Sequence, residues 1–121
     1  MKKTEKRDSG CFLIALVNNK VLGTVSISWN NKRKLRHYAE LGVTVLKEYW
    51  NHGIGTLLIQ KILEIANECS ITKINIEVTH NNNSAIHLYK KCGFCEEGMK
   101  TKVIKIDNEY INMLIMGKEI L

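Results

Sequence analysis

The apolar residues of this chain change their period once, and this change restricts the folds that the chain can adopt. From Cys11 to Leu46 they form runs or alternate with polar residues, as in β-strands. From Ile54 to Cys69 they recur at spacings of three and four, as in an amphipathic helix, and a strand pattern returns over Ile71–Val78. A crossover of this length joins parallel strands. The pattern therefore predicts an α/β fold of the α+β kind, with a mixed sheet.

Before the helix, the sequence predicts three antiparallel strands. The polar turn Asn18-Asn19-Lys20 separates expected strands over Cys11–Val17 and Val21–Trp29, and alternate residues from Val21 to Trp29 are expected to share one face. A third strand is expected over His37–Leu46, where the β-branched residues cluster. Residues 1–10 are polar and charged, without the apolar core of a secretory signal, and are expected to form a tail ahead of a single domain over residues 11–121.

After the helix, turn residues again mark the elements. Asn81-Asn82-Asn83-Ser84 can cap a short helix, and Gly93 is expected to end it. Asp107-Asn108 separates the two expected strands of a final hairpin, over residues 94–106 and 109–119.

Two glycines lie between the strand that ends near Leu46 and the first helix. Gly53 and Gly55 lack a Cβ, so the backbone here can approach a ligand closely. The first N–H groups of a helix have no intrahelical acceptor, and with the helix dipole they form an anion site. The spacing matches neither the Walker loop nor the dinucleotide-binding fingerprint. Taken alone, it leaves two interpretations open, an anion site or a plain tight connection.

Three motifs, in this order, resemble the GNAT superfamily of acyl-CoA-dependent N-acetyltransferases. They are Val43-x-Val45, Tyr49-Trp50-Asn51-His52-Gly53-Ile54-Gly55-Thr56-Leu57-Leu58, and Asn82-x-x-Ala85-Ile86-x-Leu88-Tyr89-Lys90-x-x-Gly93-Phe94. The resemblance covers about residues 11–121 and implies a GNAT-like acyl-CoA N-acyltransferase fold. Family members usually place Arg or Gln where Trp50 stands. They also usually begin with a strand and two helices before the region matching Cys11, so an N-terminally shortened fold is expected.

The resemblance implies acetyl-CoA as the cosubstrate and assigns roles to residues. Val43 and Val45 would present backbone groups to the pantetheine arm, Asn82 would bind the pantetheine from its other side, and Tyr89 would reach the sulfur. The pyrophosphate would be held by the loop residues Asn51, His52, Gly53, Ile54, Gly55 and Thr56.

Transfer of acetyl to an amine by direct attack, through a tetrahedral intermediate, has three requirements. The amine must lose a proton, the oxyanion needs a donor, and the leaving thiolate is helped by a proton. Tyr89 is the candidate acid for the thiolate. A backbone N–H between Val43 and Val45 is the candidate oxyanion donor, with a strand bulge expected at Gly42.

Two carboxylates compete for the role of general base. The stretch from Glu77 to Tyr89 is similar to that of ribosomal-protein alanine N-acetyltransferases, in which the matching glutamate is the base. Glu40, on the strand entering the site, is the alternative, and either could act through a water. Three histidines, His37, His80 and His87, are weaker candidates.

The formal charge of +6 suits an anionic ligand but is also explained by a lysine-rich, solvated surface. The densest basic run, 32–36, either keeps a turn in water or meets an anionic partner. Two non-catalytic functions therefore stay open beside the enzyme: an acyl-CoA-binding module of the same fold, and a nucleic-acid-binding domain. The second lacks the interleaved aromatic and basic residues of RNA-binding sheets.

Composition narrows the remaining possibilities. No run approaches the length of a membrane span, and a cytoplasmic protein is expected. Cys92-Gly93-Phe94-Cys95 lacks the second ligand pair that a zinc site needs, so free thiols and no metal are expected. The amine acceptor is left open between a small amine and a protein N-terminus. A second subunit, as in a homodimer, could complete the acceptor site.

Overall fold

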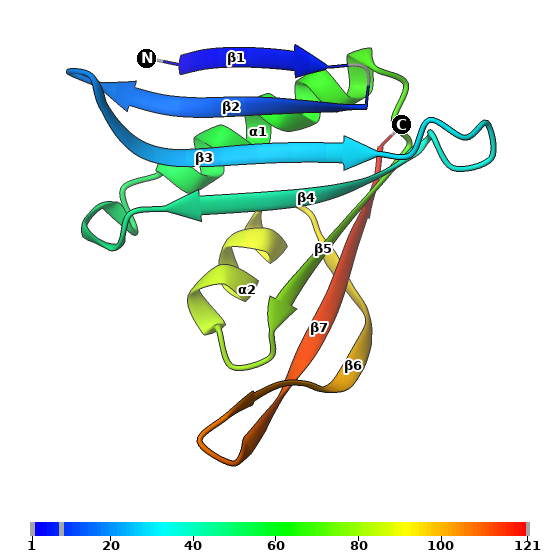
Figure 1. Cartoon of the computed structure of the whole chain (residues 1–121). Coiled ribbons are helices and arrows are strands. Elements are labelled where there is room, and N and C mark those ends of the chain that lie inside the picture. The colour runs from blue at the N-terminus through cyan, green and yellow to red at the C-terminus, as the bar shows by residue number, and fades with distance from the viewer. Residues whose placement is uncertain (1, 8, 121) are drawn as a thin grey trace. The chain divides into compact units, whose positions relative to one another are not determined.

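The computed structural model describes the backbone of residues 2–7 and 9–120, and the side chains of residues 9–120. Its chain forms two compact units, Met1–Ile74 with Glu119–Leu121, and Asn75–Lys118. The described elements are strands and two α-helices, so the predicted α+β class is confirmed. Figure 1 labels these elements along the chain.

The first unit contains an antiparallel sheet in the order β1-β2-β3-β4. Its strands are β1 (Lys2–Arg7), β2 (Gly10–Val17), β3 (Lys20–Trp29) and β4 (Tyr38–Val45). A polar tail was expected over residues 1–10, whereas Lys2–Arg7 pairs with β2 as an edge strand. The pattern of apolar residues did not predict this strand, because its pairing uses backbone groups and its sequence is polar.

The β2–β3 hairpin has the turn that its asparagines predict. Asn18 and Asn19 both have positive φ, 50° and 63°, as the two-residue turn of a twisted hairpin requires. One detail was wrong: the register shifts between Ala15 and Leu16, so Leu22 is an extra residue. This bulge buries Leu22 and leaves Val21 exposed, and the shared face expected from Val21 to Trp29 therefore begins only at Gly23.

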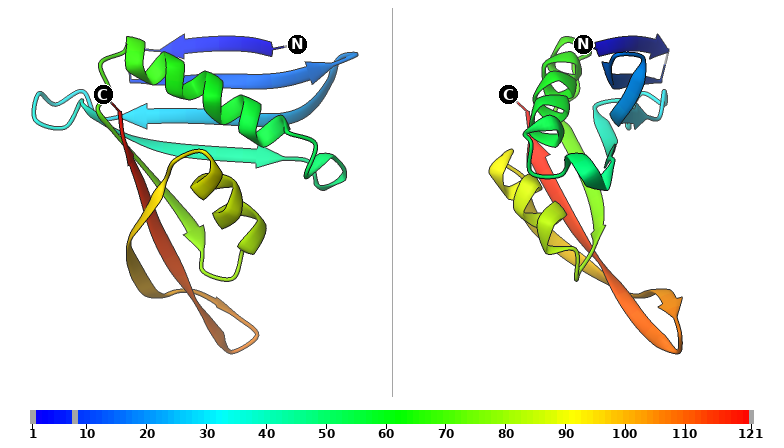
Figure 2. Two further views of the ribbon diagram at one scale, coloured as in Figure 1. Left: turned by 180° about the vertical axis from the view of Figure 1, so that it is seen from behind. Right: turned by 90° about the vertical axis from the view of Figure 1, so that its left-hand side faces the viewer.

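Helix α1 (Ile54–Glu68) covers one face of the first unit's sheet, as both views of Figure 2 show. Leu58, Ile59 and Ile62 of the helix are fully buried, and each such side chain contributes about 2 kcal/mol through burial. On the sheet side the core consists of Cys11, Leu13, Ala15, Val25, Ile27, Ala39 and Leu41. The helix can approach closely because a Cβ at Gly23 would lie 3.2 Å from Leu58 Cδ1. The helical period correctly predicted Leu58, Ile62 and Ala66 on the buried face. It also placed Leu57 there, which is 47% exposed, and it missed the fully buried Ile59.

The second unit contains most of β5 (Lys73–Thr79), helix α2 (Asn83–Lys91), and strands β6 (Cys95–Ile106) and β7 (Glu109–Glu119). Its strands run in the order β5-β7-β6, and β6 and β7 form the predicted antiparallel hairpin. Asp107 and Asn108 have φ of 49° and 66°, so this turn repeats the geometry of the first hairpin. Asn75 is buried although the alternation of β5 predicted it outside.

Candidate functional site

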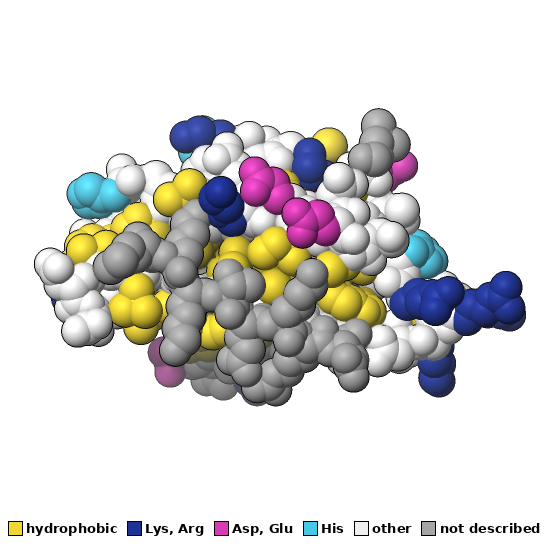
Figure 3. Space-filling view, turned by 90° about the horizontal axis from the view of Figure 1, so that it is seen from above, with side chains coloured by type: hydrophobic (Ala, Val, Ile, Leu, Met, Phe, Trp, Pro, Cys, Tyr) yellow, Lys and Arg dark blue, Asp and Glu magenta, His cyan; other side chains and the backbone are white. Residues whose placement is uncertain are grey.

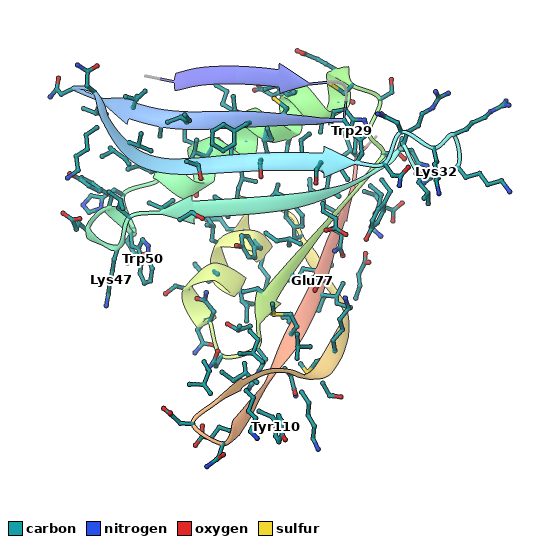
Figure 4. The ribbon with its side chains drawn as sticks, viewed as in Figure 1. Trp29, Lys32, Lys47, Trp50, Glu77 and Tyr110 are labelled. Carbon is teal, nitrogen blue, oxygen red and sulfur yellow. The ribbon has the colours of Figure 1, made fainter. Side chains whose placement is uncertain are left out.

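The connection between β4 and α1 is held by the side chain of Trp50. After β4, the chain makes a 3-10 helix, η1 (Lys47–Tyr49), and Trp50 then donates its indole N–H to the carbonyl of Val45 at 2.8 Å. Figure 4 shows Trp50 and Lys47 beside this connection, at the end of β4 opposite to Lys32. The bond closes the segment 45–50 into a compact loop. From the sequence, Trp50 was notable only because it stands where family members usually have Arg or Gln.

The pairing of β4 with β3 fixes the direction of the backbone groups at the two predicted valines. Leu46 donates its N–H to Leu22 of the neighbouring segment at 2.9 Å, and a Cβ at Gly23 would lie 2.9 Å from the carbonyl oxygen of Thr44, so these two residues face β3. Backbone groups alternate in direction along a strand. Those of Val43 and Val45 therefore point away from β3.

The bulge expected at Gly42 is absent from the pairing of β4 with β3. The register runs without a shift from Gly23↔Val45 to Trp29↔Ala39, with Gly42 opposite Ser26. This prediction was wrong because no extra residue is needed: strand alternation alone directs the backbone of Val43 to the other edge.

Helix α1 begins without a side-chain cap. Its N-cap residue, Gly53, has φ 79° and ψ 1°, makes no side-chain hydrogen bond, and accepts the N–H of Leu57 at 3.0 Å. The N–H groups of Ile54, Gly55 and Thr56 have no acceptor within the helix. A Cβ built at Gly53 would meet nothing within 4 Å, and the first turn carries no acidic residue. This helix end is open and suits an anion.

Aromatic and basic groups surround the loop. Asn51, with φ 63°, and His52 are both exposed. The Nδ1 atom of His52 lies 2.8 Å from the carbonyl oxygen of Trp50, and its ring meets the Tyr49 ring edge-on at 6.4 Å between centroids. Lys20 Nζ lies 5.4 Å from the centroid of the Tyr49 ring. Side chains therefore surround the open helix end without capping it.

In the second unit, Asn82 caps α2 as predicted. Its side-chain oxygen accepts the backbone N–H of Ala85 at 3.2 Å. The sequence assigned Asn82 to the cofactor as well, and in the structure its oxygen has this structural role while its side chain remains exposed.

Tyr89 lies on the buried side of α2. Only 6% of the residue is exposed, and its ring packs on Phe94 with centroids 6.2 Å apart. Burial, and to a smaller extent the neighbouring Cys92, raises the pKa of Tyr89 to about 12. The phenol therefore keeps its proton at neutral pH and can donate a hydrogen bond.

The two candidate bases have different surroundings. Glu77, on β5, pairs with Lys100 of the same unit, with 3.0 Å between Oε2 and Nζ, and Figure 4 labels Glu77 on its strand. Glu40, on β4 opposite Ser28, is exposed. Lys100 was not predicted as a partner, because it lies on β6, which β7 separates from β5, and the register of β6 with β7 is irregular.

The remaining histidines have surface positions, and His37, His80 and His87 are exposed. His80 is tied to Asn112 on β7, whose backbone N–H donates to its Nδ1 at 3.1 Å. Sequence inspection offered no signal for this contact, because the two residues lie 32 positions apart.

The basic run at 32–36 forms the exposed turn between β3 and β4. In the view of Figure 3, Lys and Arg side chains gather on the right-hand side. Backbone bonds from Leu35 and Arg36 to the carbonyl of Lys32 order this turn.

The four cysteines are free thiols. Burial raises the pKa of Cys92 against the opposing effect of Lys91 and Lys118. No cluster of three metal-ligating side chains occurs among residues 9–120. No helix in the described part of the chain is long and apolar enough to cross a membrane.

Known proteins with this pattern are acetyltransferases. The profile of the acetyltransferase (GNAT) family matches residues 1–94. The chain is 28% identical over 107 residues to the L-amino acid N-acetyltransferase AaaT of Escherichia coli, covering 88% of this chain and 66% of that enzyme. It spans 42% and 60% of the length of two further curated relatives.

Solved structures agree with the fold. A GNAT-family acetyltransferase from Streptococcus pneumoniae superposes with a TM-score of 0.89 at 34% identity, covering 94% of this chain and 69% of that one. The Salmonella typhimurium protein yncA, solved with its cofactor acetyl-CoA, superposes with a TM-score of 0.83 at 20% identity, covering 91% and 64%. At that identity the second likeness concerns the fold alone.

Proposed function

The chain belongs to the acetyltransferase (GNAT) family, and from this we propose that it transfers an acetyl group from acetyl-CoA to a primary amine. The observation that carries the proposal is the uncapped start of α1 at Gly53, reached through a loop of the family's pattern. Exposed backbone N–H groups, a missing Cβ and the absence of an acid in the first turn all favour a pyrophosphate there.

The strand β4 supplies the second part of the proposed binding surface. Since the backbone groups of Val43 and Val45 point away from β3, they are available to the amide groups of a pantetheine arm, which can bind like an added strand. Trp50 already occupies the carbonyl of Val45. We therefore assign the pantetheine contacts to the carbonyl of Val43 and to the N–H of Val45, and the N–H of Val43 is the proposed oxyanion donor.

In the second unit, Tyr89 is the proposed acid for the leaving thiolate. Its raised pKa of about 12 keeps the phenol protonated at neutral pH, so Tyr89 would donate a hydrogen bond to the sulfur as the thiolate forms. Asn82 is proposed to contact the pantetheine through its side-chain N–H groups, because its oxygen caps α2.

The acceptor amine must lose a proton before it attacks, and Glu77 is the first proposed base, with Glu40 as the alternative. Glu77 forms an ion pair with Lys100, with 3.0 Å between Oε2 and Nζ. The proposed acceptors follow the class of the relative's substrate, L-amino acids, together with protein N-termini and small polyamines.

The test of the function is thiol release from acetyl-CoA over a panel of these amines, run beside a calorimetric titration with CoA. Binding together with amine-dependent thiol release is expected. Binding without thiol release over the whole panel would favour a non-catalytic acyl-CoA-binding module. The absence of heat on titration with CoA would contradict the proposal.

The test of the base compares rates against pH for Glu77→Gln, Glu40→Gln and Lys100→Met. If Glu77 is the base, Glu77→Gln lowers the rate by about 100-fold or more, in the range of general base catalysis. Lys100→Met removes the ammonium group that contacts Glu77 and serves as the control for loss of that ion pair. Full activity and an unchanged profile in Glu77→Gln would transfer the role to Glu40 or to water.

A further inference from the structure

One ring nitrogen of His52 is already committed by a hydrogen bond in the loop. Its Nδ1 lies 2.8 Å from the carbonyl oxygen of Trp50. A carbonyl oxygen only accepts hydrogen bonds, so Nδ1 must carry a proton. The neutral ring therefore presents Nε2 as an acceptor, and only the protonated ring presents an N–H at that position.

His80 has a different arrangement in the same chain. Its Nδ1 lies 3.1 Å from the backbone nitrogen and 3.2 Å from the carbonyl oxygen of Asn112, so either neutral tautomer has a partner there. Protonating His52 leaves its bond to Trp50 intact and adds a donor at Nε2.

The exposed ring of His52 belongs to the loop that leads into the open end of α1. We infer that binding of CoA to this loop is coupled to uptake of one proton by His52, whose Nε2–H then donates to a phosphate oxygen. The inference rests on the proposed function, since it needs the pyrophosphate at the start of α1. The proton comes from solvent and no covalent bond of the cofactor changes.

Other charged groups around the loop do not replace this role. Lys47, Glu48 and Tyr49 are the titratable residues of η1, and Lys20 lies over the Tyr49 ring. The first turn of α1 contributes no acid. Glu48 is the carboxylate of this group that could attract the imidazolium in place of a phosphate, so it needs its own control.

The experiment measures the affinity of dephospho-CoA by calorimetry between about pH 6 and pH 8, where histidine side chains titrate. Dephospho-CoA is the probe because the 3′-phosphate of CoA itself has a pKa near 6, which would mask the effect. We expect affinity to fall about fivefold across this range, the size of one added charge pair at an exposed site. Titrations in two buffers of different ionisation enthalpy should show net proton uptake.

Variants distinguish the contribution of His52 to the pH dependence from the contributions of other charged groups. His52→Gln should bind dephospho-CoA at both pH values with the weaker affinity that the unsubstituted protein shows at about pH 8, and it should take up no proton. His52→Lys should bind at both pH values with the tighter affinity that the unsubstituted protein shows at about pH 6. His87→Gln, which changes an exposed histidine on α2, and Glu48→Gln should keep the dependence of the unsubstituted protein.

Three outcomes would overturn the coupling. They are a pH dependence that survives in His52→Gln, a dependence that disappears in Glu48→Gln, and tight binding of dephospho-CoA that is independent of pH in the unsubstituted protein. The last would leave the proposed function standing. If neither CoA nor dephospho-CoA binds at any pH, the proposed function and the coupling fail together.

Discussion

The two helices of this chain begin in opposite ways. At the start of α2 the side chain of Asn82 accepts a backbone N–H, while α1 starts at Gly53 with no side-chain bond. Glycine at the N-cap costs a helix only about a few tenths of a kcal/mol relative to a capping side chain, so α1 tolerates a start whose N–H groups remain available. The contrast distinguishes a helix start that stabilises the fold from one that is available to a ligand. Three substitutions test this distinction.

Gly53→Asp is expected to have the largest effect, because it gives α1 an anionic cap. Asp tolerates positive φ better than most residues, and its cap offsets the strain, so thermal stability should change by less than about 1 kcal/mol. A carboxylate beside the pyrophosphate should weaken CoA binding about 100-fold. Calorimetry measures the affinity, with Gly53→Asn as the neutral control of equal size. Equal affinity in the two variants would mean that the pyrophosphate binds elsewhere.

Tyr89→Phe should change the pH dependence of the free energy of unfolding at high pH. Helix α2 carries a buried phenol, that of Tyr89, and α1 has no counterpart to it. The folded protein keeps the Tyr89 proton up to a pKa of about 12, whereas the unfolded chain loses it at the ordinary tyrosine pKa of 10.0. The burial therefore contributes stability that is complete below about pH 10 and is lost as pH rises toward 12, by about 2 kcal/mol in total. Urea unfolding at pH 9 and pH 11 should show a steeper loss in the unsubstituted protein than in Tyr89→Phe. Equal losses would contradict the burial of this phenol.

Asn82→Ala should have the smallest effect, a loss of about 1 kcal/mol in the free energy of unfolding through the missing cap. Asn82→Asp keeps an acceptor at the helix start and should retain the stability. Thermal unfolding of the three proteins measures both changes. Removal of a cap at Asn82 without loss of stability would show that α2 does not depend on it.

Local chemistry explains what the sequence could predict. The Asn18-Asn19 turn and the capping asparagine depend on neighbours in the chain, and each was found where the pattern placed it. The period of α1 likewise predicted most of its buried residues, although it missed Ile59 and included the exposed Leu57. The position of the start of α1 was also predictable, because the period of the apolar residues changes there.

Long-range or backbone-only features could not be predicted in the same way. The edge strand Lys2–Arg7 pairs through its backbone, so its side chains carry no signal. The extra residue at Leu22 forms a bulge that turns Val21 outward, and composition does not reveal where this bulge occurs. The bond from Trp50 to Val45 requires the chain to fold back over η1, and the partner of Glu77 comes from a strand with an irregular register.

The bond from Trp50 to Val45 has a practical consequence for optical measurements. The chain has two tryptophans, Trp29 and Trp50, and the second has a bonded indole N–H and a ring that is 45% exposed. Indole emission depends on the polarity and hydrogen bonding around the ring. In a Trp29→Phe protein, fluorescence would come from Trp50 alone, and a CoA titration could be followed at the loop without any added dye.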